Sequence, residues 1–224
     1  MKIAVLNPNS SSSIAEILRE STLLPAGVDV DFLTGPETSP PEINGTVTAV
    51  QSAAACYPML VDLIDRYDGF LIGCYSDHPL VNMMKETTSK PVLGIFEASV
   101  LRSLAHGQKF GIVTTAQTWE PLLDRAVYAM IGNHPLFTGT VSSKLGVLEC
   151  HEAPPDVVSA KIQEAARTAY ANGARTICLG CAGMTGLDEL IKTTLGDDIK
   201  IVNGVQAGIE ILAGMIGSAS CGLA

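Results

Sequence analysis

The chain has 224 residues, of which 47% are hydrophobic and 17% charged, and its formal net charge is −9 at pH 7. This composition is typical of a compact protein with a large core and excludes an intrinsically disordered chain. The acidic balance argues against a nucleic-acid partner, because phosphate binding requires clustered lysines and arginines. No apolar run reaches the ~20 residues that span a bilayer and no signal-peptide pattern is seen, so we expect a cytoplasmic protein without membrane contact.

Apolar runs bounded by turn-forming residues predict four strands in each half of the chain. The expected strands are residues 2–6, 28–34, 70–72 and 92–95 in the first half, and 110–113, a part of 141–148, 176–179 and 199–202 in the second. Helices are expected from Ser12 or Ser13, at residues 46–67, 81–87, 119–131 and 205–216, and from the Pro154-Pro155 pair to Ala171. Strands that alternate with helices indicate parallel sheets covered on both faces.

Two Gly-Cys steps, Gly73-Cys74 and Gly180-Cys181, each follow an apolar strand. The cysteines lie 107 residues apart (181 − 74), and the first strands of the two halves, which begin at Lys2 and Lys109, have the same offset (109 − 2). Equal offsets indicate an internal duplication. We therefore expect an α/β fold with two lobes related by a pseudo-twofold axis, each with a four-stranded parallel sheet. The first lobe comprises residues 1–97 with 205–224, whose helix crosses back, and the second comprises 98–204.

The predicted ligand site lies at the carboxyl ends of the strands, where open parallel sheets bind their ligands. Asn7, Cys74, Thr114 and Cys181 all stand at such ends. A pseudo-twofold axis would then place two matched thiols on opposite walls of one cleft.

A thiol between a strand and the N-terminus of a helix has a lowered pKa, because the helix dipole and unpaired N–H groups favour the thiolate. With Cys74 as thiolate and Cys181 as thiol, or the reverse, one group removes a proton from one face of a carbon and the other returns a proton to the opposite face. This is two-base racemisation. The carbanion would place charge on an adjacent carbonyl, held by loop N–H groups. Neither G-x-G-x-x-G nor Walker A is found, so no cofactor is expected, and no metal site is predicted.

Other interpretations of these residues stay open. A single Gly-Cys step is more often a packing feature than a functional one, and only the matched pair reverses this. Cys178 and Cys181 form one C-x-x-C pattern, but no second pair accompanies it as a zinc site would require. Asn7 contacts the ligand or braces its loop, and His78 activates the neighbouring thiol or braces its loop. Trp119 lines the cleft or packs the second lobe, and packing is slightly favoured. Three further cysteines are assigned to packing: Cys56, Cys150 and Cys221.

Asn7-Pro8-Asn9-Ser10, Gly73-Cys74 and Gly180-Cys181-Ala182-Gly183-Met184 together resemble the hydantoin and allantoin racemases of the aspartate/glutamate racemase superfamily. The resemblance implies two α/β lobes, cofactor-independent racemisation of 5-substituted hydantoins, catalytic cysteines at Cys74 and Cys181, and homo-oligomers. Residues expected to contact the hydantoin ring are Asn7, Ile43, Tyr75, Ser76, Thr114, Thr115, Ala182 and Gly183.

The residues that follow the two cysteines bear on the substrate. Amino-acid racemases of the superfamily usually carry Asn or Thr there to hold the substrate carboxylate, whereas this chain has Tyr75 and Ala182, which favours an uncharged ring. Gly-Cys-Tyr-Ser-Asp-His-Pro at residues 73–79 is similar to the fungal members, which are associated with allantoin and nitrogen use. Two alternatives remain: an aspartate- or glutamate-type racemase, which substrate assays would reveal, and a non-catalytic ligand-binding relative, which would not exchange the substrate hydrogen with solvent.

Overall fold

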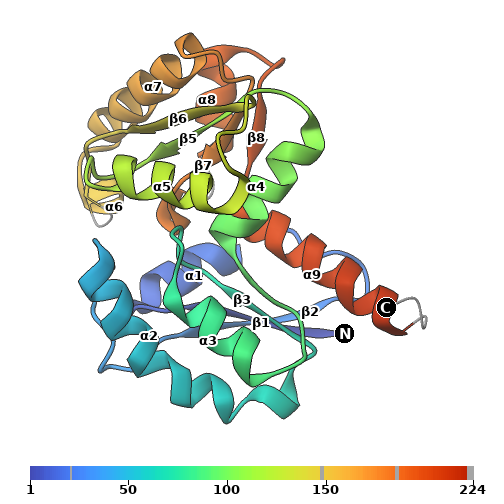
Figure 1. Ribbon diagram of the computed structural model, residues 1–224. Helices are drawn as coiled ribbons and strands as arrows, with labels where there is room; N and C mark the ends of the chain where they lie inside the picture. The colour runs from blue at the N-terminus through green and yellow to red at the C-terminus, as the bar shows by residue number, and fades with distance from the viewer. Residues whose placement is uncertain (21, 147–148, 185–186, 221–224) are drawn as a thin grey trace. The chain divides into compact units, whose positions relative to one another are not determined.

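The chain folds into two compact units, each built on one parallel sheet. The computed structural model describes residues 1–20, 22–146, 149–184 and 187–220. Unit 1 consists of Met1–Ala98 and Val205–Ala224, and unit 2 of Ser99–Gly204. In the described part of the chain each unit has a four-stranded sheet flanked by helices, which confirms the predicted α/β class (Figure 1).

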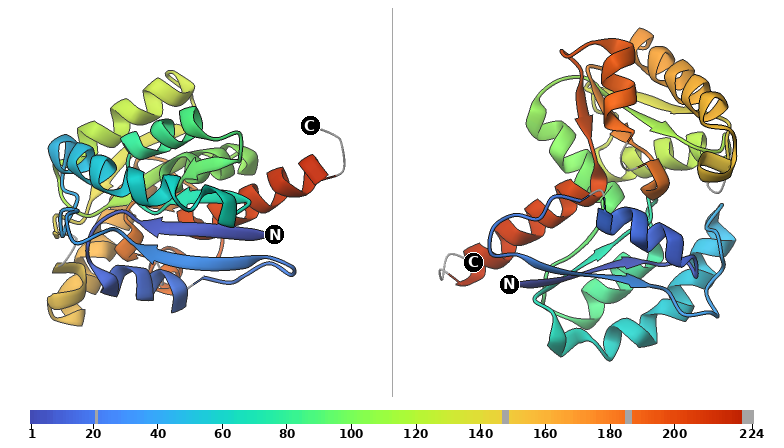
Figure 2. Two further views of the ribbon diagram at one scale, coloured as in Figure 1. Left: turned by 90° about the horizontal axis from the view of Figure 1, so that it is seen from below. Right: turned by 180° about the vertical axis from the view of Figure 1, so that it is seen from behind.

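Unit 1 has the strand order β2-β1-β3-β4, with every neighbouring pair parallel. Its elements are β1 (Lys2–Asn7), α1 (Ser12–Glu20), β2 (Asp29–Thr34), α2 (Thr46–Val61), β3 (Gly69–Ile72), α3 (Pro79–Thr87), β4 (Val92–Gly94) and α9 (Gly204–Ser220), and a 3₁₀ turn, η1, covers Ile64–Arg66. Figure 2 shows β1 and β2 running side by side in one direction. β1 and β3 are the central strands and are buried over nearly their whole length, which explains why they read as continuous apolar runs.

The two faces of this sheet are covered by different helices. Leu6 and Phe70 belong to a buried cluster with Cys56 of α2 and Met84 of α3. On β3, Leu71 points to the other face, where it meets Gly208 of α9. The C-terminal helix therefore packs on the sheet made by the N-terminal strands.

Helix α2 differs from its prediction in length and in orientation. It ends at Val61, whereas the apolar spacing predicted a helix to residue 67. The large apolar side chains Val47 and Val50 are 71% and 53% exposed, whereas small residues such as Ala49, Ala53 and Cys56 form the buried face. Small side chains allow the helix to approach the sheet closely, and of the large apolar residues predicted to face inward Leu60 is buried.

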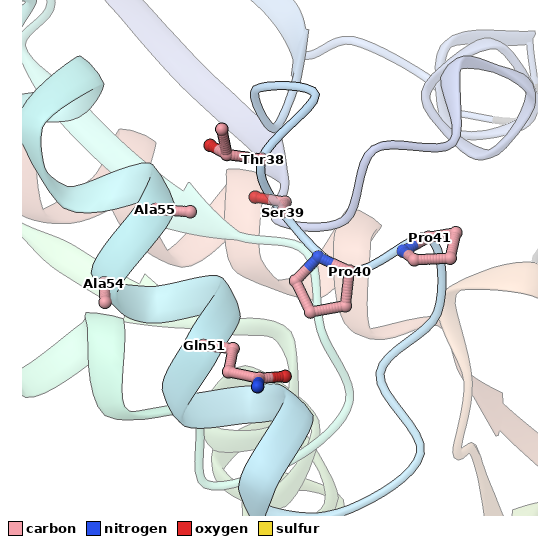
Figure 3. Close-up of a pocket in the computed structure, with 7 residues that line it drawn as sticks. All are labelled: Thr38, Ser39, Pro40, Pro41, Gln51, Ala54 and Ala55. Carbon is pink, nitrogen blue, oxygen red and sulfur yellow. The ribbon is translucent and has the colours of Figure 1, made fainter.

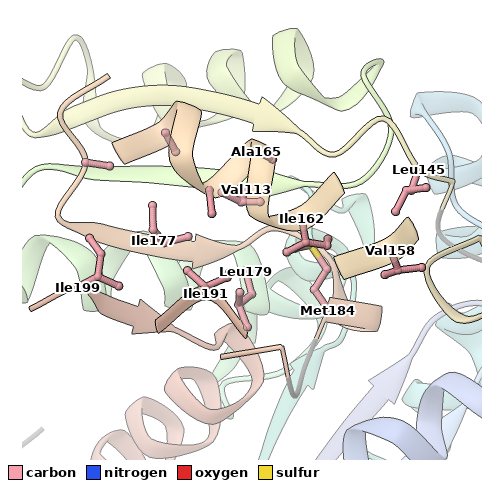
Figure 4. Packing of buried hydrophobic residues seen from close by; sticks show 13 residues of the cluster. Val113, Leu145, Val158, Ile162, Ala165, Ile177, Leu179, Met184, Ile191 and Ile199 are labelled. Carbon is pink, nitrogen blue, oxygen red and sulfur yellow. The ribbon is translucent and has the colours of Figure 1, made fainter. Parts of the chain in front are cut away.

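Unit 2 repeats this topology with the strand order β6-β5-β7-β8. Its elements are α4 (Ile95–His106), which begins in unit 1, β5 (Phe110–Thr114), α5 (Trp119–Ile131), β6 (Phe137–Ser142), α6 (Glu149–Glu152), α7 (Pro155–Ala171), β7 (Thr176–Leu179), η2 (Ala182–Met184), α8 (Asp188–Leu195) and β8 (Lys200–Val202). Val113 and Ile177 pack with Ile162 of α7 and Ile191 of α8 in one buried cluster (Figure 4). The buried Trp119 belongs to α5.

Two parts of the prediction for unit 2 were wrong. The strand expected within residues 141–148 is β6 at Phe137–Ser142, and residues 147–148 lie outside the described residues. As an edge strand that is mostly half-buried, β6 has no long apolar run, although the Phe137 ring packs 5.3 Å from that of Phe110. The sequence prediction also omitted helices α4, α6 and α8.

No helix within the described ranges is both long enough and apolar enough to cross a membrane.

Candidate active site

The first half of the predicted site is the Gly73-Cys74 step at the carboxyl end of β3. The Gly73 N–H donates a 2.7 Å hydrogen bond to the carbonyl of Leu6 on the neighbouring β1. A Cβ atom at residue 73 would lie 2.9 Å from that same oxygen, closer than side chains approach. Glycine is therefore required here, and it continues the sheet pairing up to the half-buried Cys74.

The second half, Gly180-Cys181, repeats this arrangement at the end of β7. The Gly180 N–H donates to the carbonyl of Val113 on β5 at 2.7 Å, and a Cβ atom at residue 180 would lie 2.6 Å from Ile112 Cγ2. The Thr114 hydroxyl donates to the Gly180 carbonyl at 2.8 Å and fixes the turn. Each unit thus places a half-buried cysteine after the equivalent strand of its sheet.

The residues that follow Cys74 are packed tightly. Ser76 is buried, and its Oγ lies 3.3 Å from the Cys74 Sγ. Tyr75 is buried as well, with its ring edge-on to that of Phe96 at 5.8 Å between centroids. The loop therefore holds a hydroxyl against the thiol.

His78 belongs to the same loop and caps helix α3. Its Nδ1 accepts a hydrogen bond from the backbone N–H of Leu80 at 3.3 Å, and its side chain is buried. Burial lowers the pKa of His78 to about 4, so the ring is neutral at physiological pH. Its Nε2 has no hydrogen-bond partner among the residues that the structure describes. His78 therefore braces the loop and does not provide an imidazolium beside Cys74.

Two further predicted contacts belong to unit 1. The buried Asn7 amide donates to Asn9 Oδ1 at 2.7 Å and to the Ser11 carbonyl at 2.8 Å, so its N–H groups brace the loop after β1. Ile43 is buried. An open groove of ≈ 710 Å³ lies between residues 38–41 and α2 (Figure 3). None of the predicted site residues lines this groove.

The predicted contacts of unit 2 lie at the ends of β5 and β7. Thr114 and Thr115 are buried, and within the described ranges the Thr115 Oγ1 has no hydrogen-bond partner. Ala182 and Gly183 follow Cys181 in the 3₁₀ turn η2, where the Met184 N–H donates to the Cys181 carbonyl at 3.0 Å. The segment after Cys181 begins with this short turn, where the sequence predicted the N-terminus of a helix.

Cys150 is a neighbour of Cys181 that the sequence does not reveal. Both side chains pack against the same buried cluster of unit 2. Burial, with a smaller contribution from the charge of a thiolate at Cys181, raises the pKa of Cys150 to about 12, so Cys150 stays a thiol. No local sequence pattern signals this proximity, because Cys150 belongs to α6 and Cys181 follows β7.

The other cysteines occupy packing positions where the structure describes them. Cys56 is buried, with its Sγ 3.3 Å from the Pro8 carbonyl, and burial raises its pKa. Cys178 is buried on β7, and its Sγ lies 3.0 Å from the Ser103 Oγ on α4. Cys221 lies outside the described residues.

Comparison with known proteins shows the family to which the chain belongs. The family model described as Asp/Glu/Hydantoin racemase matches residues 3–212. The chain therefore belongs to the Asp/Glu/hydantoin racemase family, a family of isomerases.

Individual relatives align with this chain over nearly its full length. An uncharacterized protein of Schizosaccharomyces pombe, C1F7.10, is 38% identical, with 96% of this chain and 92% of the relative covered. The hydantoin racemase of Pseudomonas sp. (strain NS671) is 27% identical, with 94% of this chain and 84% of the relative covered. Among solved structures, allantoin racemase from Pseudomonas fluorescens superimposes with a TM-score of 0.85 at 26% identity, covering 98% of this chain and 92% of that one.

Proposed function

We propose that this protein is a cofactor-independent racemase of 5-substituted hydantoins, allantoin included, with Cys74 and Cys181 as its two acid–base groups. The observation that carries the proposal is the repeated Gly-Cys step. In both units a glycine N–H pairs with the central strand at 2.7 Å and leaves a half-buried cysteine at the end of the equivalent strand. A reaction with two opposed proton-transfer groups requires two such groups in equivalent positions, and the duplicated cysteines provide them.

In the proposed reaction one thiolate removes the proton from the ring carbon that carries the substituent. The electron pair left on that carbon delocalises onto the adjacent ring carbonyl as an enolate. The other thiol then donates its proton to the opposite face, so the product is the other enantiomer and the two cysteines have exchanged protonation states. A hydrogen bond from the Ser76 hydroxyl to Cys74 Sγ, 3.3 Å away, would stabilise the thiolate form.

The absence of positive charge from the segments around the two Gly-Cys pairs supports a neutral ring as substrate. Residues 73–79, 114–118 and 180–184 contain no lysine or arginine. A substrate carboxylate buried against these segments would find no positively charged partner within them, which is costly in a site of low dielectric constant. The Thr115 hydroxyl, buried at the end of β5, is available to a ring carbonyl or N–H group.

The test combines chirality and isotope exchange. Cys74→Ser and Cys181→Ser should each lower the rate of allantoin or 5-alkylhydantoin racemisation by about 10²–10⁴-fold, because a hydroxyl is a poor acid–base group at neutral pH. In D₂O each variant should still exchange the substrate hydrogen without inversion, and the two variants should prefer opposite enantiomers. Cys56→Ser, whose side chain only packs in unit 1, is the matched control and should racemise normally.

Three results would contradict the proposal. Racemisation at a near wild-type rate in either variant would remove that cysteine from the mechanism, and exchange of the same enantiomer by both variants would exclude opposed bases. If the wild type racemised aspartate or glutamate and left hydantoins unchanged, the assigned substrate class would be wrong.

A further inference from the structure

Unit 2 contains a concave site formed by residues other than those proposed for racemisation. A cavity of ≈ 300 Å³ lies between the start of α5, the end of β6 and one face of α7. Lys161, Glu164 and Thr168 of α7 line it from that face, and Glu120 of α5 lines it together with Gln117, which precedes this helix. Its volume lies at the lower end of the range for small-molecule sites.

The charged groups of this cavity are balanced. Lys144 and Lys161 line it together with Glu120 and Glu164. The Glu120 carboxylate is held in place because its Oε1 accepts hydrogen bonds from the Ser142 N–H at 2.8 Å and the Ser142 hydroxyl at 2.7 Å. Among described residues neither lysine has a carboxylate within 4.0 Å, although Lys161 is half-buried. The cavity thus offers one positioned carboxylate and two ammonium groups that form no ion pair with the described part of the chain.

This balance selects the charge of the ligand. An anion would meet Glu120 and Glu164 in a chain whose net charge is already −9, and a cation would meet the two lysines. A molecule with one charge of each sign and no net charge avoids both penalties and satisfies both pairs. We propose that the cavity binds a small zwitterionic α-amino acid, with its carboxylate on Lys144 and Lys161 and its ammonium group on Glu120 and Glu164.

The cavity is connected to the end of β5 by the backbone after β6. The Ser143 N–H donates to the Thr114 carbonyl at 2.8 Å, and the Lys144 N–H donates to the Thr115 carbonyl at 2.9 Å. Lys144 has a positive φ of 62°, a left-handed conformation that is unfavourable for a non-glycine residue. A carboxylate bound to its ammonium group therefore acts on a residue that directly contacts Thr115.

The test is a calorimetric titration of the full-length protein with glycine and L-glutamine, and with acetate and ethylammonium as probes of a single charge. Both amino acids should bind, and neither singly charged probe should. Lys161→Met and Glu164→Gln should each weaken binding at least about tenfold, the effect expected when one charged partner is lost. Lys200→Met is the matched control, because this exposed lysine lies on β8 at the opposite edge of the sheet from β6.

The alternatives give different results. No binding of either amino acid below about 10 mM would overturn the proposal, as would unchanged affinity in Lys161→Met and Glu164→Gln. If Cys74→Ser or Cys181→Ser abolished binding and the cavity variants did not, the amino acid would occupy the racemase site and the cavity assignment would be wrong. Because binding is measured without turnover, the outcome does not depend on the proposed hydantoin substrate.

Discussion

At the scale of single residues, His78 links the packing of the Cys74 loop to the stability of the protein. Its ring is buried and accepts the Leu80 N–H, so the folded protein holds it neutral down to a pKa of about 4, whereas an unperturbed histidine has a pKa of 6.5. Between these values the unfolded chain binds the extra proton. The free energy of unfolding must therefore fall as the pH decreases through this window.

Replacing His78 with asparagine should remove most of this dependence. Asparagine keeps an acceptor for the N-terminus of α3 but has no titrating group. We expect the His78→Asn variant to be less stable than the wild type at pH 8. When the pH is lowered from 7 to 4, its free energy of unfolding should fall by about 3 kcal/mol less than that of the wild type, which is the energy equivalent of the shift in pKa. Urea unfolding at a series of pH values measures both effects. Parallel stability curves for the two proteins would show that His78 is not held neutral by the fold.

At the scale of elements, the contact between α9 and β3 depends on one glycine. A Cβ atom at Gly208 would lie 2.4 Å from the Cδ1 of Leu71, which is fully buried, whereas one at Gly214 in the same helix would meet nothing within 4 Å. Substitutions at these two positions therefore allow the effect of close packing on stability to be distinguished from the effect of helix propensity within one helix.

Gly208→Ala should destabilise the protein by about 1–3 kcal/mol, because the helix must move away from the sheet or Leu71 must leave its rotamer. Gly214→Ala should stabilise it by about 0.5–1 kcal/mol, because alanine is the better helix former and the position is exposed. Denaturant unfolding compares the two variants directly. Stabilisation by both substitutions would mean that α9 does not pack closely on β3.

At the scale of the whole molecule, unit 1 is discontinuous in sequence. Its sheet is built from the first 98 residues, but one face is covered by α9 from the C-terminus, and the Leu23 N–H donates to the Gln206 side chain at 3.0 Å. The two ends of the chain thus stabilise the same unit.

Deletion of residues 205–224 should therefore weaken unit 1 more than unit 2. We expect faster amide hydrogen exchange in β1 and β3, because Leu71 and its neighbours lose their cover, and a smaller change in β5 and β7. Mass-spectrometric exchange on the full-length and shortened proteins reports both units in one experiment. Equal acceleration in the two units would contradict the assignment of α9 to unit 1.

The sequence by itself determined the class of the fold, the central strands and the paired cysteines. β1, β3, β5 and β7 are each buried over nearly their whole length, so hydrophobicity alone locates them. Gly73 and Gly180 have no room for a Cβ atom beside the neighbouring strand, so both halves of the chain keep a glycine there and the duplication can be recognised in the sequence. These features are local, and a local pattern is sufficient to find them.

Only the tertiary structure decided which faces and edges are buried. Val47 and Val50 suit a buried helix face, yet α2 turns Ala53 and Cys56 inward because small side chains fit the close approach to the sheet. The prediction placed β6 too late in the chain. An edge strand is covered on fewer sides, so it lacks the continuous apolar run that locates the central strands. The neutral state of His78 and the gathering of Lys144 and Glu120 with Lys161 around one cavity likewise depend on groups distant in sequence. Burial and electrostatics depend on these long-range contacts, and a single sequence carries no local signal for them.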